Sequence, residues 1–415
     1  MAKPARSGDQ GVGDFTTLGL LGEAAARQGA SLIAINPLHA LFNDRREAPI
    51  EGRGLGRPDG ADVRRFAEGH AERVRFHMFL QWLCERQLRA AAARASGLAI
   101  GIGRDLAIGA APDGAEVWSN AELVADGVAL GAPPDPIAPQ GQVWGLPPYD
   151  PHRLRAEGYA SLADLFARNM RHAGALRIDH VMGLARQFWV PDGAPGDAGA
   201  YVAFPLQDLL GELALESVRA RCLVVGEDLG TVPEGLRDTL QAARMLSYRV
   251  LPFERDGERF RASESYPALA CACVSTHDLP PLQGWWQGAD IAERETLGLL
   301  SPDGAEAARS ERLEAKRALI AALAEAGLVP PGEDPGAPLS AGLAAAIHGF
   351  IARGPSVVAM AQVDDLAGEV VGVNLPGTDT ERPNWRRRIA APVESLFDGD
   401  LAARILEALQ LARPG

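Results

Sequence analysis

The chain has 415 residues, enough for one large domain or two ordinary ones, and its 47% apolar and 23% charged residues are an ordinary globular balance. Acidic residues outnumber basic ones by 54 to 41, which gives a net charge of −13. A surface of this sign attracts neither phosphate backbones nor anionic lipids, so nucleic-acid and membrane partners are not expected.

Seven short aliphatic runs alternate with longer segments of helical periodicity. Short aliphatic runs are typical of buried parallel strands. Their alternation with helical segments predicts an α/β fold with a parallel sheet. Seven such strands fit a (β/α)8 TIM barrel that lacks one member. The runs are Ser31–Asn36, Leu98–Asp105, Ala175–Asp179, Cys222–Glu227, Tyr248–Phe253, Ala270–Asp278 and Val357–Val363. The predicted helical segments are Ala61–Arg94, Leu162–Ala173, Phe204–Ala220, Pro233–Met245 and Ala305–Ala326.

No segment of the sequence separates two independent cores, so we expect residues 1–415 to form a single catalytic barrel domain with loop insertions. Met1–Gln10 is polar and carries no apolar signal segment, and no run approaches the ~18 apolar residues of a membrane helix. The four cysteines are too few and too scattered for a disulfide framework, which favours the cytoplasm. Cys271 and Cys273 are read as buried packing residues, with a metal or redox role as the alternative.

Three of the predicted strands end in acidic residues: Asp179, Glu227 and Asp278. In a barrel, catalytic groups come from the carboxyl ends of the strands. Strand alternation puts Arg177 and Asp179 on one face, where a guanidinium favours the charged carboxylate. If Glu227 lies near Asp179, the second negative charge raises its pKa, and it can serve as a general acid. Two carboxyl groups ~5–5.5 Å apart would form the pair of a retaining glycosidase.

Each of these motifs also has a purely structural interpretation. An Arg-x-Asp strand end can be an ion pair, Glu227-Asp228 can cap a helix, and His277-Asp278 can be either a cap or a site. Three such ends in one series of strands favour the catalytic interpretation. The same pairs could instead bind metal in a metallohydrolase, but the His-x₃-His or paired-Cys spacings typical of zinc sites are missing.

With these residues in place, the chain resembles the 4-α-glucanotransferases (amylomaltase, or disproportionating enzyme) of the α-amylase clan. The combination of motifs, which spans nearly the whole chain, is much more specific than any one of them. The matching stretches are Gly11–Phe15, Asn36–Phe42, Gly131–Asp135, Gly141–Pro148, Ala175–Leu184, Val225–Pro233, Ser275–Pro280 and Asn374–Arg388.

The resemblance implies that Asp179 is the nucleophile, Glu227 the general acid/base and Asp278 the transition-state stabiliser. It implies a double displacement that moves a segment of an α-1,4-glucan to the 4-hydroxyl of another glucan or glucose, without metal or organic cofactor. The implied substrates are maltooligosaccharides and other α-1,4-glucans. Candidate substrate-binding residues are Arg177, His277, His180, Trp144, Asp135, Gln142, Asp105 and Asn384. Trp144 is either a sugar-stacking residue or a core residue.

Two parts of the family pattern are missing from this sequence. An apolar first strand should precede Gly11–Phe15, and a long rim segment should follow Asn36–Phe42, where Asn43–Asp62 stands instead. We therefore expect an incomplete barrel with the catalytic acids retained and transfer weakened or lost. The alternatives are an α-glucan hydrolase and a non-catalytic glucan-binding relative. The sequence indicates no oligomeric state.

Overall fold

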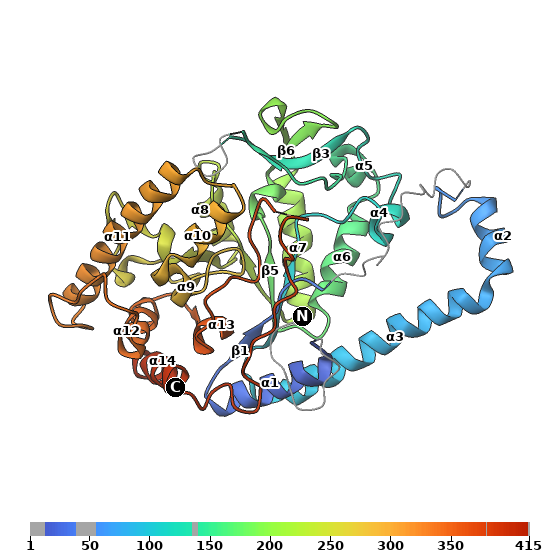
Figure 1. The fold of residues 1–415 in the computed structure, drawn as a ribbon. Helices are drawn as coiled ribbons and strands as arrows, with labels where there is room; N and C mark the ends of the chain where they lie inside the picture. The colour runs from blue at the N-terminus through green and yellow to red at the C-terminus, as the bar shows by residue number, and fades with distance from the viewer. Residues whose placement is uncertain (1–12, 39–54, 135–139, 379, 414–415) are drawn as a thin grey trace. The chain divides into compact units, whose positions relative to one another are not determined.

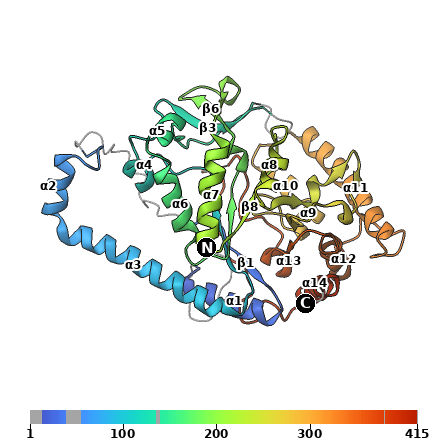
Figure 2. The same cartoon turned by 180° about the vertical axis from the view of Figure 1, so that it is seen from behind.

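The computed structural model of the protein describes residues 13–38, 55–134, 140–378 and 380–413. These residues form two compact units. Unit 1 contains the described residues up to 33, from 93 to 101 and from 244 onward, and unit 2 contains those from 34 to 92 and from 102 to 243. Figures 1 and 2 show their elements from two sides.

Most of a four-stranded sheet, in the order β1-β2-β5-β8, lies in unit 2. β2 pairs in parallel with β5, and β5 with β8. Parallel neighbours need long crossovers, and α6 (Ala160–Met170) and α7 (Leu206–Ala220), which pack on each other, precede β5 and β8 (Figure 2). The strands are β1 (Leu32–Ala34), β2 (Gly101–Leu106), β5 (Ala175–Ile178) and β8 (Leu223–Gly226).

A second sheet of unit 2 is antiparallel, in the order β4-β3-β6-β7. Its strands are β3 (Val128–Ala132), β4 (Gln142–Val143), β6 (Arg186–Pro191) and β7 (Ala200–Ala203). Along the sequence, β6 and β7 lie between β5 and α7. The remaining elements of this unit are α2 (Ala61–Gly69), most of α3 (Ala71–Arg94), α4 (Ala115–Ser119), α5 (Pro151–Ala156), α8 (Leu236–Ala242), η3 (Val181–Leu184) and η4 (Gly196–Ala198).

Unit 1 is built on a parallel sheet of three strands, in the order β13-β12-β9. The strands are β9 (Ser247–Val250), β12 (Ala270–Cys273) and β13 (Val358–Met360), and all four residues of β12 are buried, Cys271 and Cys273 among them. The sheet packs into a core with α11 and α12. The other elements are α1 (Phe15–Arg27), α9 (Leu282–Gln287), α10 (Ala289–Thr296), α11 (Pro302–Glu325), α12 (Ala341–Ala352), α13 (Val363–Leu366), α14 (Asp400–Ala412), η2 (Ala95–Gly97), η5 (Leu251–Phe253), η6 (Ser263–Ser265), β10 (Arg255–Asp256) and β11 (Arg259–Phe260).

All seven predicted runs overlap a strand, but four of these strands end two or more residues earlier than expected, among them β1 at Ala34 and β13 at Met360. β9 stops at Val250 because Pro252, which lacks an N–H donor, lies in the 3₁₀ turn η5. β12 stops at Cys273, and residues to Asp278 form the turn that follows. The helix predicted from Pro233 begins only at Leu236, because Pro233 accepts a turn hydrogen bond and Gly235 has a left-handed backbone.

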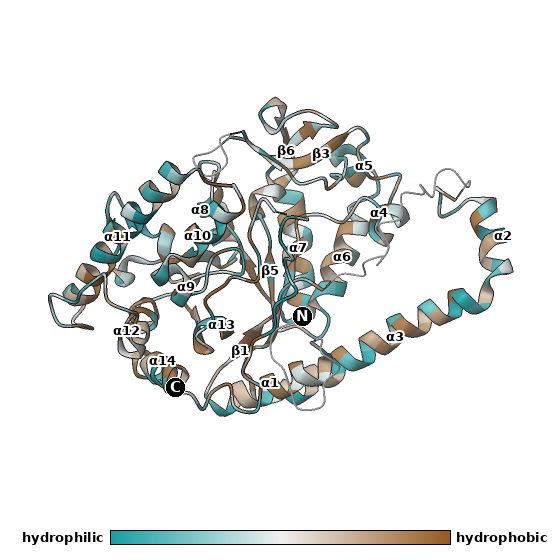
Figure 3. Cartoon of the chain, viewed as in Figure 1, coloured by the Kyte–Doolittle hydropathy of each residue, from teal (hydrophilic) through white to brown (hydrophobic). Residues whose placement is uncertain are grey.

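The helical segment predicted over Ala61–Arg94 forms two helices, α2 and α3, which are interrupted at His70. Much of the apolar surface of α3 is not covered by described residues. Leu88 and Ala91 are its only buried residues. Figure 3 shows hydrophobic and hydrophilic residues mixed along it. Although α3 and α11 each have 24 residues, no helix in the described part of the chain is both long and apolar enough to cross a membrane.

We predict that Gly284→Ala destabilises the protein by about 1–3 kcal/mol, as overpacking typically does. A Cβ at this position of α9 would lie 1.8 Å from the backbone oxygen of Val370, so one of the two backbones must shift. Chemical denaturation of the purified chain measures the effect.

Gly211→Ala is the matched control, because Gly211 lies inside α7 with no atom within 4 Å of the added methyl group. Alanine there should be neutral or stabilising by up to about 1 kcal/mol. Equal stabilities of the two variants would contradict the close approach at Gly284.

Candidate active site

Asp179 and Glu227 each follow directly on a strand of the unit 2 sheet. The N–H of Asp179 donates to the oxygen of Leu106 over 3.0 Å, and the N–H of Glu227 donates to the oxygen of Ile178 over 3.0 Å. The sheet's hydrogen bonding therefore continues through both residues. Because β5 and β8 are parallel neighbours, the two acids lie at the same edge of the sheet.

Arg177 joins the carboxyl groups at this edge. Its Nη1 donates to Asp179 Oδ1 and to Asp105 Oδ1, both at 2.8 Å, and its Nη2 lies 4.0 Å from Glu227 Oε2. Asp105 stands directly opposite Arg177 in the register of β2 and β5. The prediction that Arg177 and Asp179 share a face is confirmed, and Asp105, which is buried, completes a charged cluster with these two partly exposed side chains.

Glu227 is 8% exposed, and burial raises its pKa to about 7. The charge of Asp179 adds to the rise, whereas Arg177 and the N–H groups of Leu229 and His180 oppose it. The sequence suggested a raised pKa caused by the second carboxylate, but removal from water is the larger cause. Near neutral pH this side chain can hold a proton and release it, as a general acid/base must.

His180 contacts Glu227 through its backbone rather than through its ring. Its N–H donates to Glu227 Oε2 over 2.9 Å, and the N–H of Leu229 donates to Glu227 Oε1 over 2.8 Å. His180 adopts a left-handed conformation with φ of 45°, which costs about 1–3 kcal/mol outside glycine. The strained turn aims an N–H at the carboxyl group. Burial lowers the pKa of the His180 ring, which favours the neutral imidazole.

Trp144 and Gln142 lie next to His180. The rings of Trp144 and His180 meet edge to face, with centroids 5.5 Å apart. Trp144 Nε1–H donates to Gln142 Oε1 over 3.1 Å. Trp144 is only half-buried, so part of the indole surface is open to solvent. Asp135, another sequence candidate, lies outside the described residues.

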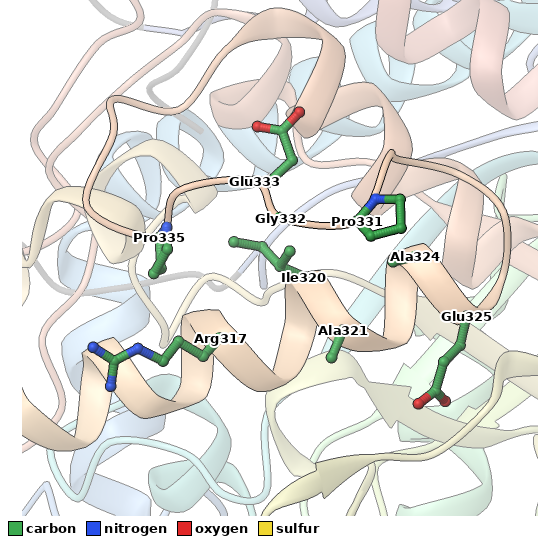
Figure 4. Close-up of a pocket in the computed structure, with 9 residues that line it drawn as sticks. All are labelled: Arg317, Ile320, Ala321, Ala324, Glu325, Pro331, Gly332, Glu333 and Pro335. Carbon is green, nitrogen blue, oxygen red and sulfur yellow. The ribbon is translucent and has the colours of Figure 1, made fainter.

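A cavity of about 250 Å³ lies in unit 2, and Asp179, His180 and Tyr149 line it. Glu227 and Trp144 are not among its lining residues. A hollow also lies on unit 1, between α11 and the turn that follows it, where Figure 4 shows Arg317, Glu325 and Glu333. None of the candidate acids lines that hollow. The cavity beside Asp179 is therefore the candidate active site of unit 2.

Asp278 and His277 belong to unit 1, in the turn after β12. His277 Nε2 lies 3.0 Å from Asp278 Oδ2, and the rings of His277 and Trp385 have centroids 5.5 Å apart. Asn374 donates from Nδ2 to Asp278 Oδ1 over 2.7 Å. Asn374 was not among the sequence candidates, and its only signal was its place at the start of the matching stretch Asn374–Arg388.

The side chain of Asn384 forms hydrogen bonds within its own loop. Its amide oxygen accepts from the N–H of Leu375 and from Arg382, and its amide nitrogen donates to Thr378. These bonds favour a structural role for Asn384 over substrate binding. Among the described residues, no three His, Cys, Asp or Glu side chains gather as a metal ion would require.

The chain is similar to known proteins of one family. The profile of the 4-alpha-glucanotransferase family matches residues 52–393. The 4-alpha-glucanotransferase of Haemophilus influenzae is 40% identical over 337 residues, which cover 80% of this chain and 48% of that protein. The enzyme of the same name from Mycobacterium tuberculosis is 39% identical over 376 residues, 87% of this chain and 51% of that protein. The chain thus spans about half the length of these relatives.

Two solved structures are also similar. Amylomaltase from Corynebacterium glutamicum superposes with a TM-score of 0.87 at 29% identity, over 98% of this chain and 74% of that one. Amylomaltase from Streptococcus agalactiae, solved in complex with acarbose, gives a TM-score of 0.69 at 17% identity, over 96% and 73%. The predicted α/β fold of the (β/α)8-barrel class is confirmed.

We predict that Glu227→Gln becomes more stable relative to the wild type as the pH rises from 4 to 8. The pKa of Glu227 is about 7 in the folded chain against 4.5 ordinarily, so the folded state binds its proton more tightly. Wild-type stability from this group is then lost as the pH rises through that window, and glutamine has no such loss. The change in the free-energy difference should be on the order of 3 kcal/mol.

Denaturation at a series of pH values measures this change. Glu234→Gln is the matched control, because Glu234 is exposed in the loop before α8 and should show no comparable trend. A stability difference between Glu227→Gln and the wild type that stays constant from pH 4 to 8 would contradict the buried, protonated carboxyl.

Proposed function

Because the chain belongs to the 4-α-glucanotransferase family, we propose that it transfers a segment of an α-1,4-glucan to the 4-hydroxyl of another glucan or of glucose. The observation that carries this proposal is the contrast between two neighbouring carboxyl groups. Asp179 is hydrogen-bonded to a guanidinium, whereas Glu227 is buried with a pKa of about 7. One is suited to attack as a carboxylate, and the other to deliver a proton.

In the first step, the Asp179 carboxylate attacks the anomeric carbon while Glu227 gives its proton to the glycosidic oxygen. The bond to the leaving glucan breaks, and a glycosyl ester of Asp179 remains. In the second step, Glu227 takes the proton from the incoming 4-hydroxyl, whose oxygen attacks the anomeric carbon. The ester bond breaks, the Asp179 carboxylate is released, and a new α-1,4 bond has formed.

Other side chains position these groups and the sugar. Arg177 orients the attacking oxygen of Asp179, and Asp105 fixes Arg177. We assign the open face of Trp144 to stacking on a pyranose, with Gln142 holding the indole in place. For Asp278 we propose hydrogen bonds to sugar hydroxyls that strengthen in the transition state, with its carboxylate oriented by Asn374. His277 is proposed to bind the same sugar.

No cofactor is part of this proposal, and the cytoplasm is the proposed location, since the few, scattered cysteines suit a reducing compartment. The proposed substrates are maltooligosaccharides and longer α-1,4-glucans. Water competes with the acceptor hydroxyl at the ester, so exclusion of water from the cavity beside Asp179 separates a transferase from a hydrolase.

Incubation with maltotriose tests the function. We expect glucans longer than maltotriose to form together with shorter products, and Asp179→Asn to slow the reaction by at least about 10³-fold, since the amide cannot form the ester. Chromatography of the products measures both. Asp192→Asn, in an exposed turn after β6, is the control and should retain full activity.

The other outcomes identify the rival functions. Glucose without any longer product would show an α-glucan hydrolase. Binding of maltotriose without products would show a non-catalytic glucan-binding protein. Equal activity of Asp179→Asn and the wild type would remove Asp179 as the nucleophile.

The pH dependence of the reaction tests the role of Glu227. Its pKa of about 7 means that the proton needed in the first step is lost above neutral pH. We expect kcat/KM to fall about tenfold per pH unit on the alkaline side of pH 7. Substrate binding measured at the same pH values serves as the control, and a rate that stays level to pH 9 would contradict the assignment.

A further inference from the structure

Asn374 contacts Asp278 from a part of unit 1 that is neither helix nor strand. Its Nδ2 donates to Asp278 Oδ1 over 2.7 Å. Residues 371–375 lie outside the helices and strands of the structure, so no regular ladder of backbone hydrogen bonds holds this amide in place. The position of Asn374 must therefore come from individual contacts with its surroundings.

Arg382 holds the backbone on both sides of Asn374. Its Nη2 donates over 2.6 Å to the oxygen of Gly372, which lies two residues before Asn374. Its Nη1 donates to Asn384 Oδ1 over 2.7 Å, and the same oxygen accepts from the N–H of Leu375 over 3.1 Å. One guanidinium thus fixes the chain before the amide directly and after it through Asn384.

Arg382 is itself anchored to a helix. Its Nε donates to Glu293 Oε1 over 2.8 Å, and its Nη2 donates to Glu293 Oε2 over 3.3 Å. Glu293 belongs to α10, which is tied to α11 because Arg312 donates to both carboxyl oxygens of Asp290 over 2.9 and 2.8 Å. The Arg382 side chain is only 7% exposed, so water competes little for its bonds. The contacts therefore run from two packed helices to the amide beside Asp278.

We propose that Arg382 is a positioning residue for Asp278, because it fixes the backbone around Asn374 to α10 and thereby holds the amide that orients this carboxylate. The inference rests on the proposed function, in which Asp278 forms hydrogen bonds to sugar hydroxyls that strengthen in the transition state. Arg382 acts without touching the sugar. A shift of the backbone around Asn374 withdraws the amide, and Asp278 loses the orientation that the transition state requires.

The geometry at this position requires an arginine. Arg382 forms four hydrogen bonds to three groups: the carboxylate of Glu293, the carbonyl of Gly372 and the amide oxygen of Asn384. A guanidinium can do so because its five N–H donors are spread over a planar fork, whereas the donors of a lysine share a single nitrogen. The alternative is an ion pair that stabilises unit 1 without affecting the chemistry, and kinetics separate the two.

Steady-state kinetics of the full chain with maltotriose test the inference. Arg382→Ala should lower kcat by about 10–100-fold, as is typical for residues that orient active-site groups. KM should change by less than about threefold, because the lost interaction is made in the transition state. Arg413→Ala is the matched control, since Arg413 likewise donates to three backbone oxygens of unit 1. Its kcat should stay within about twofold of the wild type, because distant sites act independently.

A double-mutant cycle tests the path through Asn374. Asn374→Ala alone should lower kcat about as much as Arg382→Ala does. In the Asn374→Ala background, Arg382→Ala should cost less than about threefold more, because no amide is left to position. If Arg382 only stabilised the fold, the two effects would instead multiply in full.

Glu293→Gln is a milder second variant, which decides the question should Arg382→Ala fail to fold. Glutamine keeps the shape of the side chain but loses its charge, which weakens the pair with Arg382. We expect kcat to fall by about threefold to tenfold, a smaller loss than full removal of the orienting group. Circular dichroism verifies that the variant is folded.

Two results would overturn this inference alone: a wild-type kcat in Arg382→Ala or Glu293→Gln, and effects of Arg382→Ala and Asn374→Ala that multiply in full. A loss that appears in KM and not in kcat would also overturn it. A wild type that forms no products from maltotriose would overturn the proposed function, and this inference with it.

Discussion

A single guanidinium links the acidic side chains of the candidate active site in unit 2. Arg177 lies among three carboxyl groups, two within hydrogen-bond distance and one 4.0 Å away. Without a cation, like charges this close in a buried site could not all ionise. With it, Asp105 and Asp179 are paired, while Glu227, farther off and deeper, keeps its proton to near neutrality. The contrast between Asp179, which is paired with a guanidinium, and Glu227, which is buried and has a raised pKa, thus arises from one side chain and from unequal burial.

The sequence predicted those features that depend on local pattern. A period of two along β5 suffices to place Arg177 and Asp179 on one face, and aliphatic runs suffice to locate all seven parallel strands. The contact of Asn374 with Asp278 joins residues 96 positions apart, which no local pattern encodes. The left-handed turn at His180 and the burial of Glu227 depend likewise on what packs around them. Their energetic effects therefore became visible only in three dimensions.

The helix α3 also shows that a local pattern does not encode long-range contacts. Its apolar period correctly predicted a helix, because the period depends on the backbone alone. The period locates the helix, but it does not say what packs against it. At β9 and α8, by contrast, the errors were local and concern where elements end: Pro252 and Gly235 act within a turn or two. Sequence patterns are thus more informative about the type of an element than about its surroundings.

The excursion formed by β6 and β7 has a consequence for how proteins of this kind can change. This segment begins at Ala185, six residues after Asp179. The N–H of Phe204 donates to the oxygen of Ala185 over 2.9 Å. This hydrogen bond joins the two ends of the segment, and α7 begins directly afterwards at Leu206. Insertions or deletions between these two hydrogen-bonded ends need not move β5 or β8. New surface can therefore be added in this segment, close to Asp179, without altering the charged cluster around Arg177.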